Sequence, residues 1–334
     1  MKVLVTGGAG YIGSTTAKAL EQAGHVPVIL DSLLTGPRAF VRDRAFYEGD
    51  IADRALVRRI LDEHPDVECT IHMAARIVVP ESMAQPFAYY RDNVAKSLEL
   101  FDELVELGKP RVVFSSSASL YDVVEGLEVD EESPLNPQSP YARTKRMMEE
   151  VLEDMARATD LRALILRYFN PIGADPDLES GVYARVPSHI LGQLVLAATG
   201  QRDAFAVTGN DFPTKDGTGV RDYLHVWDLA QAHVTAIERF DSALDQVGAP
   251  STIVNIGTGS GVTVRELIAA FEDVFGRPVP TVDAPPRPGD VLGAYANVDK
   301  ARDLLGWTSK LTVADGIASA LAWNARRPEV LGYA

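Results

Sequence analysis

A glycine-rich segment near the start of the chain constrains the fold more than any other feature. The segment Thr6-Gly7-Gly8-Ala9-Gly10-Tyr11-Ile12-Gly13 directly follows an apolar run, residues 3–5. The pattern predicts a buried strand over residues 2–5 and a helix over residues 11–23, with Ile12, Ala19 and Leu20 facing inward. The glycines then occupy a strand-to-helix turn, where the free N–H groups of the helix attract a pyrophosphate and Gly7, Gly10 and Gly13 leave room for it.

A second apolar run, residues 26–30, ends in Asp31. An acidic residue at this place accepts hydrogen bonds from an adenosine ribose diol and repels a 2′-phosphate. We therefore predict NAD rather than NADP as the cofactor. An ordinary tight turn of an α/β protein would explain the glycines alone, but not the strand, the spacing and the acid together.

Apolar runs alternate with helix-length connections along the first half of the chain, which predicts an α/β fold of the Rossmann type with a doubly wound parallel sheet. Further strands are expected at 69–73, 111–115 and 162–167. After Pro171 the chain is rich in Pro, Gly and Asp around a helix at 190–198, and order returns at 223–240 and 252–256. We expect an NAD-binding domain over 1–171 plus about 222–258. A smaller mixed α/β substrate-binding domain is expected over about 172–221 plus 259–334.

Composition excludes several classes of function. The 334 residues include 32 basic and 47 acidic side chains, a net charge of −15, which argues against nucleic-acid or anionic-membrane partners. Cys69 is the one cysteine, so neither an internal disulfide nor a multi-thiolate metal site can form. His72, His225 and His233 lack metal-ligand spacing, and we predict no metal. With no leader before Lys2 and no long apolar run, a cytoplasmic enzyme is expected.

Three residues in the middle of the chain have the types and spacing of a proton-transfer site. Ser139-Pro140 is typical of a helix start, which places Tyr141 and Lys145 at i and i+4 on one helix face. A lysine ammonium and a nicotinamide cation nearby would favour the phenolate of Tyr141 and make it a base. Ser117, at the end of the preceding strand, would hydrogen-bond the same substrate hydroxyl. A Tyr-x-x-x-Lys pair alone is more often a solvated surface pair, but here it accompanies a dinucleotide turn.

Several longer motifs resemble the extended short-chain dehydrogenase/reductase family and, within it, the UDP-glucose 4-epimerases. The resemblance covers nearly the whole chain, and its motifs are the glycine-rich turn, Asp50-Ile51, FSSSA at 114–118, PQSPY at 137–141, RYFNP at 167–171, GNDFPT at 209–214, DGTGVRDY at 216–223 and PGD at 288–290. The last three are the most specific. Ser117-Ala118-Ser119 stands where sugar-nucleotide dehydratases typically carry Thr-Asp-Glu, which disfavours dehydration.

The resemblance implies a transfer of hydride between sugar C4 and tightly bound NAD, through a transient 4-keto sugar that turns over and is reduced on its other face. The implied catalytic residues are Ser117, Tyr141 and Lys145. The implied cofactor-binding residues are Gly7, Gly10, Tyr11, Ile12, Gly13, Asp31, Asp50, Ile51, Ala74, Ala75, Asn93, Ser115, Tyr141, Lys145 and Tyr168. The implied substrate-binding residues are Ser117, Tyr141, Asn170, His189, Arg221, Arg287, Asp290 and Ala294.

Some positions depart from the family pattern. Ala294 stands where some members carry a tyrosine that closes the sugar pocket, so we expect room for a 2-acetamido group and turnover of UDP-GlcNAc/UDP-GalNAc besides UDP-Glc/UDP-Gal. Ile77 replaces a frequent lysine, Asp92 a frequent asparagine and Asp122 a frequent glycine. His189 replaces a frequent asparagine that touches the diphosphate; an imidazole N–H can substitute, although a lone histidine more often ends a helix.

Alternatives to the epimerase hypothesis remain open. One is another sugar-nucleotide enzyme, such as a UDP-uronate 4-epimerase or a reductase, although no extra basic residue in the motifs supplies a donor for a sugar carboxylate. The other is a catalytically silent NAD-binding regulator, against which the intact Ser117, Tyr141 and Lys145 argue. The resemblance also implies a homodimer through helices at 88–105 and 139–155, where Ala95, Leu98, Leu104, Met147, Met148, Val151 and Met155 would serve equally well as core.

Overall fold

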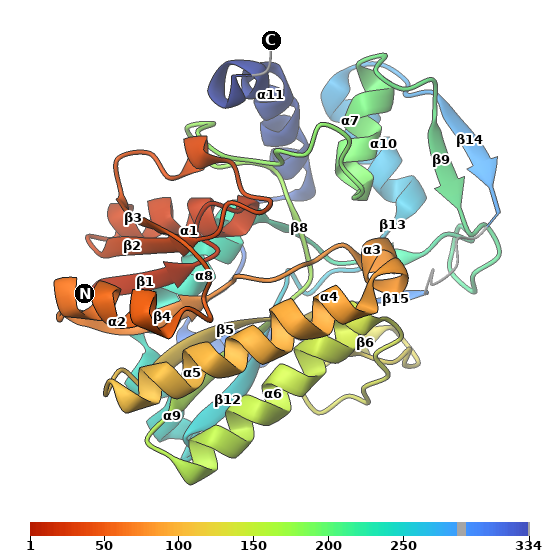
Figure 1. Ribbon diagram of the computed structural model, residues 1–334. Helices are drawn as coiled ribbons and strands as arrows, with labels where there is room; N and C mark the ends of the chain where they lie inside the picture. Colours follow the sequence, from red (N-terminus) through yellow and green to blue (C-terminus); the bar gives the residue numbers. More distant parts are fainter. Residues whose placement is uncertain (286–291, 333–334) are drawn as a thin grey trace.

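The computed structural model describes residues 1–285 and 292–332, and a seven-stranded parallel sheet forms its centre (Figure 1). The strand order is β12-β7-β5-β4-β1-β2-β3. The strands are β1 (Lys2–Thr6), β2 (Val26–Asp31), β3 (Ala45–Glu48), β4 (Val67–His72), β5 (Arg111–Ser117), β7 (Arg162–Tyr168) and β12 (Ser251–Ile256). The predicted doubly wound sheet is confirmed, and each strand lies within two residues of its expected bounds where the sequence predicted one.

Helices cover both faces of this sheet because alternate strand residues point to opposite sides. Val3 and Val5 face one hydrophobic core and Leu4 faces the other. The first core lies under α1 (Tyr11–Gln22), α8 (Val226–Glu238) and α9 (Phe240–Val247). The second lies under α2 (Arg54–Glu63), α5 (Lys96–Glu106) and α6 (Pro140–Ala158). Cys69 is buried in the first core, as expected.

A second region is built from shorter elements around its own core of Leu194, Leu267, Phe271 and Ile317. Its helices are α7 (Ile190–Ala198), α10 (Val264–Phe275) and α11 (Val313–Leu331), seen together at the upper right of Figure 1. Two strand pairs are β8 (Asn170–Ile172) with β11 (Tyr223–His225) and β9 (Phe205–Thr208) with β14 (Thr281–Ala284). A small sheet has the order β13 (Val262–Thr263), β10 (Val220–Arg221), β15 (Gly293–Ala296) and β6 (Glu128–Val129).

The predicted helix at 88–105 is interrupted. It consists of α4 (Pro86–Tyr90), one wider π turn (Arg91–Ala95) and α5, after a short α3 (Val79–Ala84). Ionic and amide contacts of the π turn hold the preceding loop, and a wider turn of this kind is often found at functional sites. Single 3₁₀ or π turns also lie at Arg38–Phe40, Ala118–Leu120 and Ala301–Leu305. The predicted 139–155 helix is α6, which begins one residue later and continues to Ala158.

One face of α1 joins the two regions. The Tyr11 hydroxyl donates to the Gly173 carbonyl oxygen (2.6 Å), and the Thr15 and Ser180 hydroxyls lie 3.1 Å apart. One turn further, the Lys18 ammonium pairs with Asp175 at 3.0 Å. The spacing of 4 and 3 residues places these side chains on one helix face. The helix that carries the glycine turn is therefore fixed directly to the chain segment after β8.

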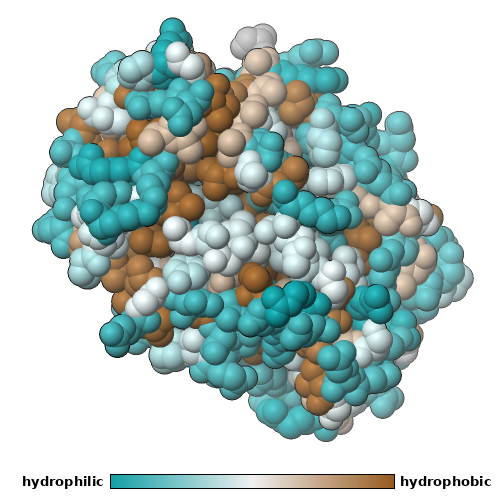
Figure 2. All heavy atoms as spheres, turned by 180° about the vertical axis from the view of Figure 1, so that it is seen from behind, coloured by the Kyte–Doolittle hydropathy of each residue, from teal (hydrophilic) through white to brown (hydrophobic). Residues whose placement is uncertain are grey.

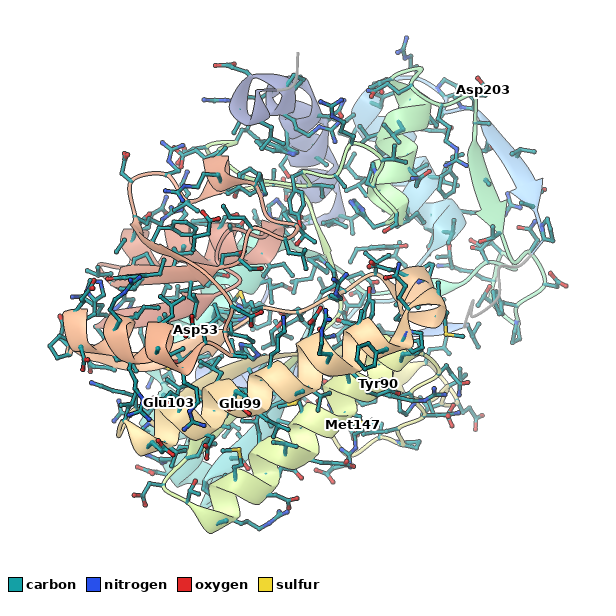
Figure 3. All side chains as sticks on the ribbon, viewed as in Figure 1. Asp53, Tyr90, Glu99, Glu103, Met147 and Asp203 are labelled. Carbon is teal, nitrogen blue, oxygen red and sulfur yellow. The ribbon has the colours of Figure 1, made fainter. Side chains whose placement is uncertain are left out.

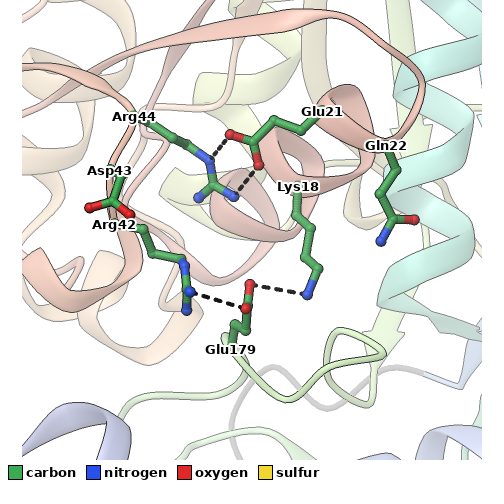
Figure 4. Close-up of a pocket in the computed structure, with 7 residues that line it drawn as sticks. All are labelled: Lys18, Glu21, Gln22, Arg42, Asp43, Arg44 and Glu179. Atoms are coloured by element: carbon green, nitrogen blue, oxygen red, sulfur yellow. Dashed lines mark hydrogen bonds and ion pairs between the residues drawn. The ribbon is translucent and has the colours of Figure 1, made fainter.

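Beside this junction lies a surface hollow of about 430 Å³ (Figure 4). Lys18 and Arg42 both pair with Glu179, and Arg44 pairs with Glu21. Each of these three cations is thus already neutralised by a carboxylate. The hollow also lies away from the carboxyl edge of the sheet, so we assign it no ligand.

The face seen from behind carries hydrophilic side chains around its margin and hydrophobic ones interspersed among them (Figure 2). Within residues 1–285 and 292–332, no helix combines the length and the apolar character that crossing a membrane requires.

Candidate active site

The carboxyl ends of the parallel strands bring the predicted cofactor residues to one edge of the sheet. Gly7 follows β1, and Asp31 ends β2. Ala74 and Ala75 follow β4, while Ser115 and Ser117 end β5. Strand pairing sets Ser117 directly beside Tyr168 at the end of β7. Ligands of open α/β sheets bind at this edge.

The glycine turn fits a pyrophosphate. Gly7 has φ +73°, and a Cβ atom there would lie 2.7 Å from the Ala74 nitrogen. A Cβ atom on Gly13 would overlap the Gly7 carbonyl oxygen. No side chain of the described residues caps α1 at Gly10, so its first N–H groups stay available to a ligand anion. Tyr11 and Ile12 form the first helical positions, with the Tyr11 hydroxyl engaged by Gly173.

The Asp31 carboxylate is prepared for two further hydrogen bonds. It accepts from the Ala9 nitrogen at 2.9 Å and from the Leu33 nitrogen at 2.8 Å. Burial raises the pKa of Asp31, and these two N–H groups lower it. A carboxylate accepts about four hydrogen bonds, so capacity remains for a ribose diol. The next loop holds Asp50, whose carboxylate pairs with Lys96 at 2.5 Å, and the buried Ile51.

The sequence correctly predicted how α6 begins. The Ser139 hydroxyl caps the helix by accepting from the Ala142 nitrogen at 3.1 Å, and Pro140 follows at the first position. The cap sets Tyr141 and Lys145 on the side facing β5. Lys145 is 3% exposed, and its ammonium donates to the Ser115 carbonyl oxygen at 2.6 Å.

Two hydroxyl contacts complete this corner of the site. The Ser117 hydroxyl hydrogen-bonds that of Ser119 at 2.9 Å. The Ser115 hydroxyl contacts the Tyr168 hydroxyl, and Tyr168 is 8% exposed. Ser115, Ser117, Tyr141, Lys145 and Tyr168 therefore form one cluster across β5, β7 and α6.

The pKa of Tyr141 differs from the expectation of a lowered value. Burial raises the pKa of the phenol, and a hydrogen bond with Ser117 opposes this rise. Burial likewise lowers the pKa of Lys145 to about 7, while the Glu149 carboxylate raises it. The expectation treated the ammonium as fully charged and close to the phenol. In the protein alone desolvation has the largest effect on both groups, because burial penalises both charged forms.

Sequence reasoning missed a buried ion pair beneath this cluster. Arg167, 1% exposed, donates to both oxygens of Glu149, at 2.9 and 2.7 Å. Ser116 also donates to Glu149 at 2.5 Å. Two signals were present in the sequence: an arginine inside an apolar strand, and a glutamate one turn beyond Lys145. Glu149 thus ties β5, β7 and α6 together behind the candidate catalytic residues.

Three of the predicted sugar-nucleotide residues lie on short strands, Asn170 on β8, Arg221 on β10 and Ala294 on β15. Strand register pairs Arg221 with Ala294, so these two are direct neighbours on β10 and β15. The Arg221 guanidinium donates to the Val220 and Leu292 carbonyl oxygens, at 2.7 and 3.2 Å. The Asn170 amide donates to the Asp222 carbonyl oxygen at 3.3 Å. Arg287 and Asp290 lie outside the described residues.

His189 is the N-cap of α7, where its Nδ1 accepts from the Gly192 nitrogen at 3.2 Å. Burial lowers the pKa of His189 to about 4, so the ring is neutral and its proton lies on Nε2. Within the described chain, Nε2 is buried with no hydrogen-bond partner. Such a donor costs free energy unless a ligand oxygen accepts from it. His189 therefore caps the start of a helix and also retains a donor suited to a phosphate oxygen.

The structure also places the positions that depart from the family pattern. Ile77 is 60% exposed on the loop after β4. Asp122 accepts from the Val123 nitrogen and the Asn136 amide. Asn93, predicted to bind the cofactor, is 3% exposed, and its amide bonds the main chain of Arg76 and the Thr144 hydroxyl.

Across residues 1–285 and 292–332, no group of three or more His, Cys, Asp or Glu side chains is arranged to hold a metal ion. His72 instead hydrogen-bonds Thr6 and Ser97 at the centre of the sheet, and burial lowers its pKa to about 3. The His233 Nδ1–H donates to the Leu229 carbonyl oxygen within α8.

Comparison with known proteins assigns the chain to a class. The sequence model of the NAD dependent epimerase/dehydratase family matches residues 3–257. The chain belongs to this family. Among curated relatives, a UDP-glucose 4-epimerase of Azospirillum brasilense is 41% identical, covering 100% of this chain and 94% of the relative. A UDP-glucose 4-epimerase of Bacillus subtilis is 39% identical over 100% and 99% of the two chains.

Solved structures give the same result. A UDP-glucose 4-epimerase of Stenotrophomonas maltophila with bound NAD and formylated UDP-arabinopyranose has a TM-score of 0.93, 36% identity and coverage of 98% of this chain and 99% of that one. The enzyme of Bifidobacterium longum in complex with NAD⁺ and UDP has a TM-score of 0.91, 34% identity and coverage of 99% and 100%.

Proposed function

We propose that this protein is an NAD-dependent UDP-glucose 4-epimerase that interconverts UDP-glucose and UDP-galactose. The observation that carries the proposal is the cluster of Ser117, Tyr141 and Lys145 beside a glycine turn that fits a pyrophosphate. Full-length relatives of the same name support it. Incubation with UDP-galactose, without added NAD, should produce the anomeric proton signal of UDP-glucose. No conversion, even after NAD is supplied, would refute the proposal.

Bound NAD supplies an electron acceptor for the sugar C4 position and returns the electrons, so net redox change is zero. Tyr141 removes the proton of the 4-hydroxyl, and Ser117 hydrogen-bonds that hydroxyl. The transient 4-keto sugar turns over within the site so that it is reduced at C4 on its other face, and Tyr141 returns the proton to the 4-oxygen. Positive charge close to the buried phenol is required, since burial alone raises its pKa. Lys145, one helical turn beyond Tyr141 on α6 and with a pKa of about 7, is the residue that we propose supplies this charge.

In this proposal the protein binds the substrate mainly through its nucleotide part rather than through its sugar. We assign UDP binding to the second region, about 172–221 plus 259–334, with Arg221 and His189 as contacts, and with Asn170 at the start of the adjoining β8 as a third. A guanidinium fork suits phosphate oxygens, and the buried His189 Nε2 lacks a partner among the described residues. We add Arg287 and Asp290 to these proposed UDP contacts on the basis of the sequence alone. A held UDP and a loosely held sugar allow the sugar to turn.

We also propose that N-acetylated sugars are turned over. Ala294 lies beside Arg221 in the strand register, and its small side chain leaves the sugar pocket open there. Ala294→Tyr should reduce turnover of UDP-GalNAc more than that of UDP-galactose. Both activities are measured on the same protein sample, so each serves as the control for the other. An unchanged ratio of UDP-GalNAc turnover to UDP-galactose turnover would refute the role of Ala294.

We propose a homodimer formed by α4, α5 and α6, which lie side by side with Tyr90 and Met147 on the same face (Figure 3). Large apolar side chains are exposed on this face, namely Phe87 (75%), Leu98 (39%) and Met147 (40%). Apolar side chains gathered on one exposed face favour burial against a partner. Leu104 and Met148, by contrast, are core residues, and Ala95 is exposed.

Met147→Glu should convert the dimer to monomer in light scattering at micromolar concentration. Val247→Glu is the matched control, because Val247 is 41% exposed on α9, away from this face. A monomeric wild-type protein would refute the dimer.

We further propose a cytoplasmic location, as expected from the sequence. Recovery of the protein in the cytoplasmic fraction of cells would support this location, and recovery in a secreted fraction would refute it.

A further inference from the structure

Two consecutive residues of the π turn hold one residue of the loop after β4. The Asn93 amide accepts from the Arg76 nitrogen at 2.8 Å and donates to its carbonyl oxygen at 2.9 Å. The neighbouring Asp92 accepts from the Arg76 Nε at 2.7 Å. The two contacts are made at opposite ends of Arg76, one at its main chain and one at its guanidinium. Asn93 thus fixes the main chain of the loop, and Asp92 fixes its side chain.

Ion pairs extend from Asp92 in both directions. Lys96 pairs with Asp92 at 3.0 Å and with Asp50 at 2.5 Å. Arg76 pairs with Glu81 at 3.2 Å. We call these five residues (Asp50, Arg76, Glu81, Asp92 and Lys96) the rim network. The contacts form one continuous chain from the loop after β3 to α3.

Asp92 is the centre of the rim network and its least exposed member. Its side chain is 10% exposed and that of Arg76 is 19% exposed. Burial raises the pKa of Asp92, but hydrogen bonds from Arg91, Arg76 and Lys96 hold it well below its usual range. Partly desolvated pairs exceed ordinary surface ion pairs in strength, and because Lys96 and Asp50 are 28% and 42% exposed, salt still screens them in part.

The two ends of the network flank the proposed dinucleotide groove. Arg76 follows Ala74, whose backbone nitrogen would lie 2.7 Å from a Cβ atom on Gly7. At the other end, Asp50 follows Gly49, whose nitrogen donates to the Asp31 carbonyl oxygen at 3.0 Å. The network therefore links the segment facing the glycine turn to the segment beside the ribose-binding acid.

We propose that Asp92 is a positioning residue for NAD, which holds the loop at Ala74–Arg76 and the loop at Asp50 in place through the rim network and so slows NAD release. This rests on the proposed NAD-dependent function. Without the Asp92 charge, Arg76 keeps Glu81 at 3.2 Å and its main-chain bonds to Asn93, while Lys96 keeps only Asp50, so the ionic link between the two flanking loops is lost. An epimerase needs its cofactor through every turnover, because no outside redox partner regenerates it.

The test compares Asp92→Asn with Asp102→Asn. Asp102 lies on α5 and pairs with Arg54 at 2.7 Å, outside the rim network, so it controls for loss of an acidic residue from the same helix. The proteins are loaded with NAD and passed through gel filtration, and retained nucleotide is measured by chromatography after denaturation. Asp92→Asn should release NAD about tenfold faster, a change worth about 1.4 kcal/mol, with kcat at saturating NAD within about twofold of wild type.

Salt separates this role from a merely structural one. Wild type and Asp102→Asn should release NAD faster as salt rises, because salt screens the pairs, whereas Asp92→Asn should show little dependence. Asp92→Glu should restore slow release. If Asp92→Asn fails to fold, Lys96→Met, which removes the central cation, should show the same faster and salt-independent release.

Three results would overturn the proposal. The first is release of NAD from Asp92→Asn at the wild-type rate. The second is slower release of NAD from Asp92→Asn, which would mean that the freed cations bind the pyrophosphate. The third is an equal change in the rate of NAD release for Asp92→Asn and Asp102→Asn. A wild-type protein that binds no NAD would refute the cofactor assignment itself and this inference with it.

Discussion

Replacing Lys145 by methionine should stabilise the NAD-free protein at neutral pH, although it removes a proposed catalytic group. Lys145 is 3% exposed, and burial lowers its pKa from 10.5 to about 7. Between these two values the unfolded chain binds more protons than the folded chain, so stability rises with pH. The burial cost is thus fully present below the folded pKa of about 7 and disappears as pH rises toward 10.5.

The magnitude follows from the same shift. At pH 7 the Lys145 amine is half protonated in the folded protein, and its burial lowers the free energy of unfolding by about 4 kcal/mol. This cost falls by about 3 kcal/mol by about pH 9.5. The Lys145 bond to the Ser115 carbonyl oxygen, 2.6 Å long, offsets part of this cost, since leaving that oxygen unpaired costs about 1–2 kcal/mol. Lys145→Met should therefore be more stable by about 2–3 kcal/mol at pH 7, and this advantage should vanish by about pH 9.5.

Urea unfolding of the NAD-free proteins at both pH values tests this. Lys215→Met is the control, because Lys215 is 63% exposed and should show no such pH dependence. If the stabilities of wild type and Lys145→Met differ by a constant amount from pH 7 to about pH 9.5, the lysine is fully protonated in the folded state. The argument from desolvation would then be wrong.

Three further outcomes are expected. Tyr141→Phe should lower kcat by about 10²–10⁴-fold, the usual effect of removing a general base, while nucleotide retention stays at the wild-type level. Gly13→Ala should abolish NAD retention, measured by chromatography of released nucleotide, because its Cβ would overlap the Gly7 carbonyl oxygen. Glu149→Gln should destabilise the protein by about 3–5 kcal/mol in urea unfolding, because Arg167 is left buried without its counter-charge. Combining it with Arg167→Met should recover most of that loss, and no recovery would show that the pair is not the cause.

Periodicity and turn chemistry sufficed for the sheet and for the start of α6. The run before Gly7 alternates between two cores, as a strand covered on both faces must. Ser139-Pro140 marks a helix start because a hydroxyl cap and a fixed φ act within a few residues. Features that depend on neighbours in sequence were therefore predictable.

Features that depend on distant partners were not. The π turn at Arg91–Ala95 follows no sequence period, since it is stabilised by contacts of Asp92 and Asn93 with Arg76. The raised pKa of Tyr141 in the protein without NAD could not be predicted either, because desolvation depends on how deeply the site is covered. The hydrogen bonds between the Asn93 amide and the main chain of Arg76 likewise could not be predicted, because only the fold brings these two residues together.

The most direct test of the central claim follows the hydrogen at sugar C4. UDP-galactose deuterated at C4 is incubated in ordinary water with the purified protein and no added NAD, and the product is observed by NMR. The account predicts UDP-glucose that retains deuterium at C4, because hydrogen leaves and returns within one closed site. Incorporation of solvent hydrogen at C4, or the absence of any UDP-glucose even with NAD supplied, would contradict it.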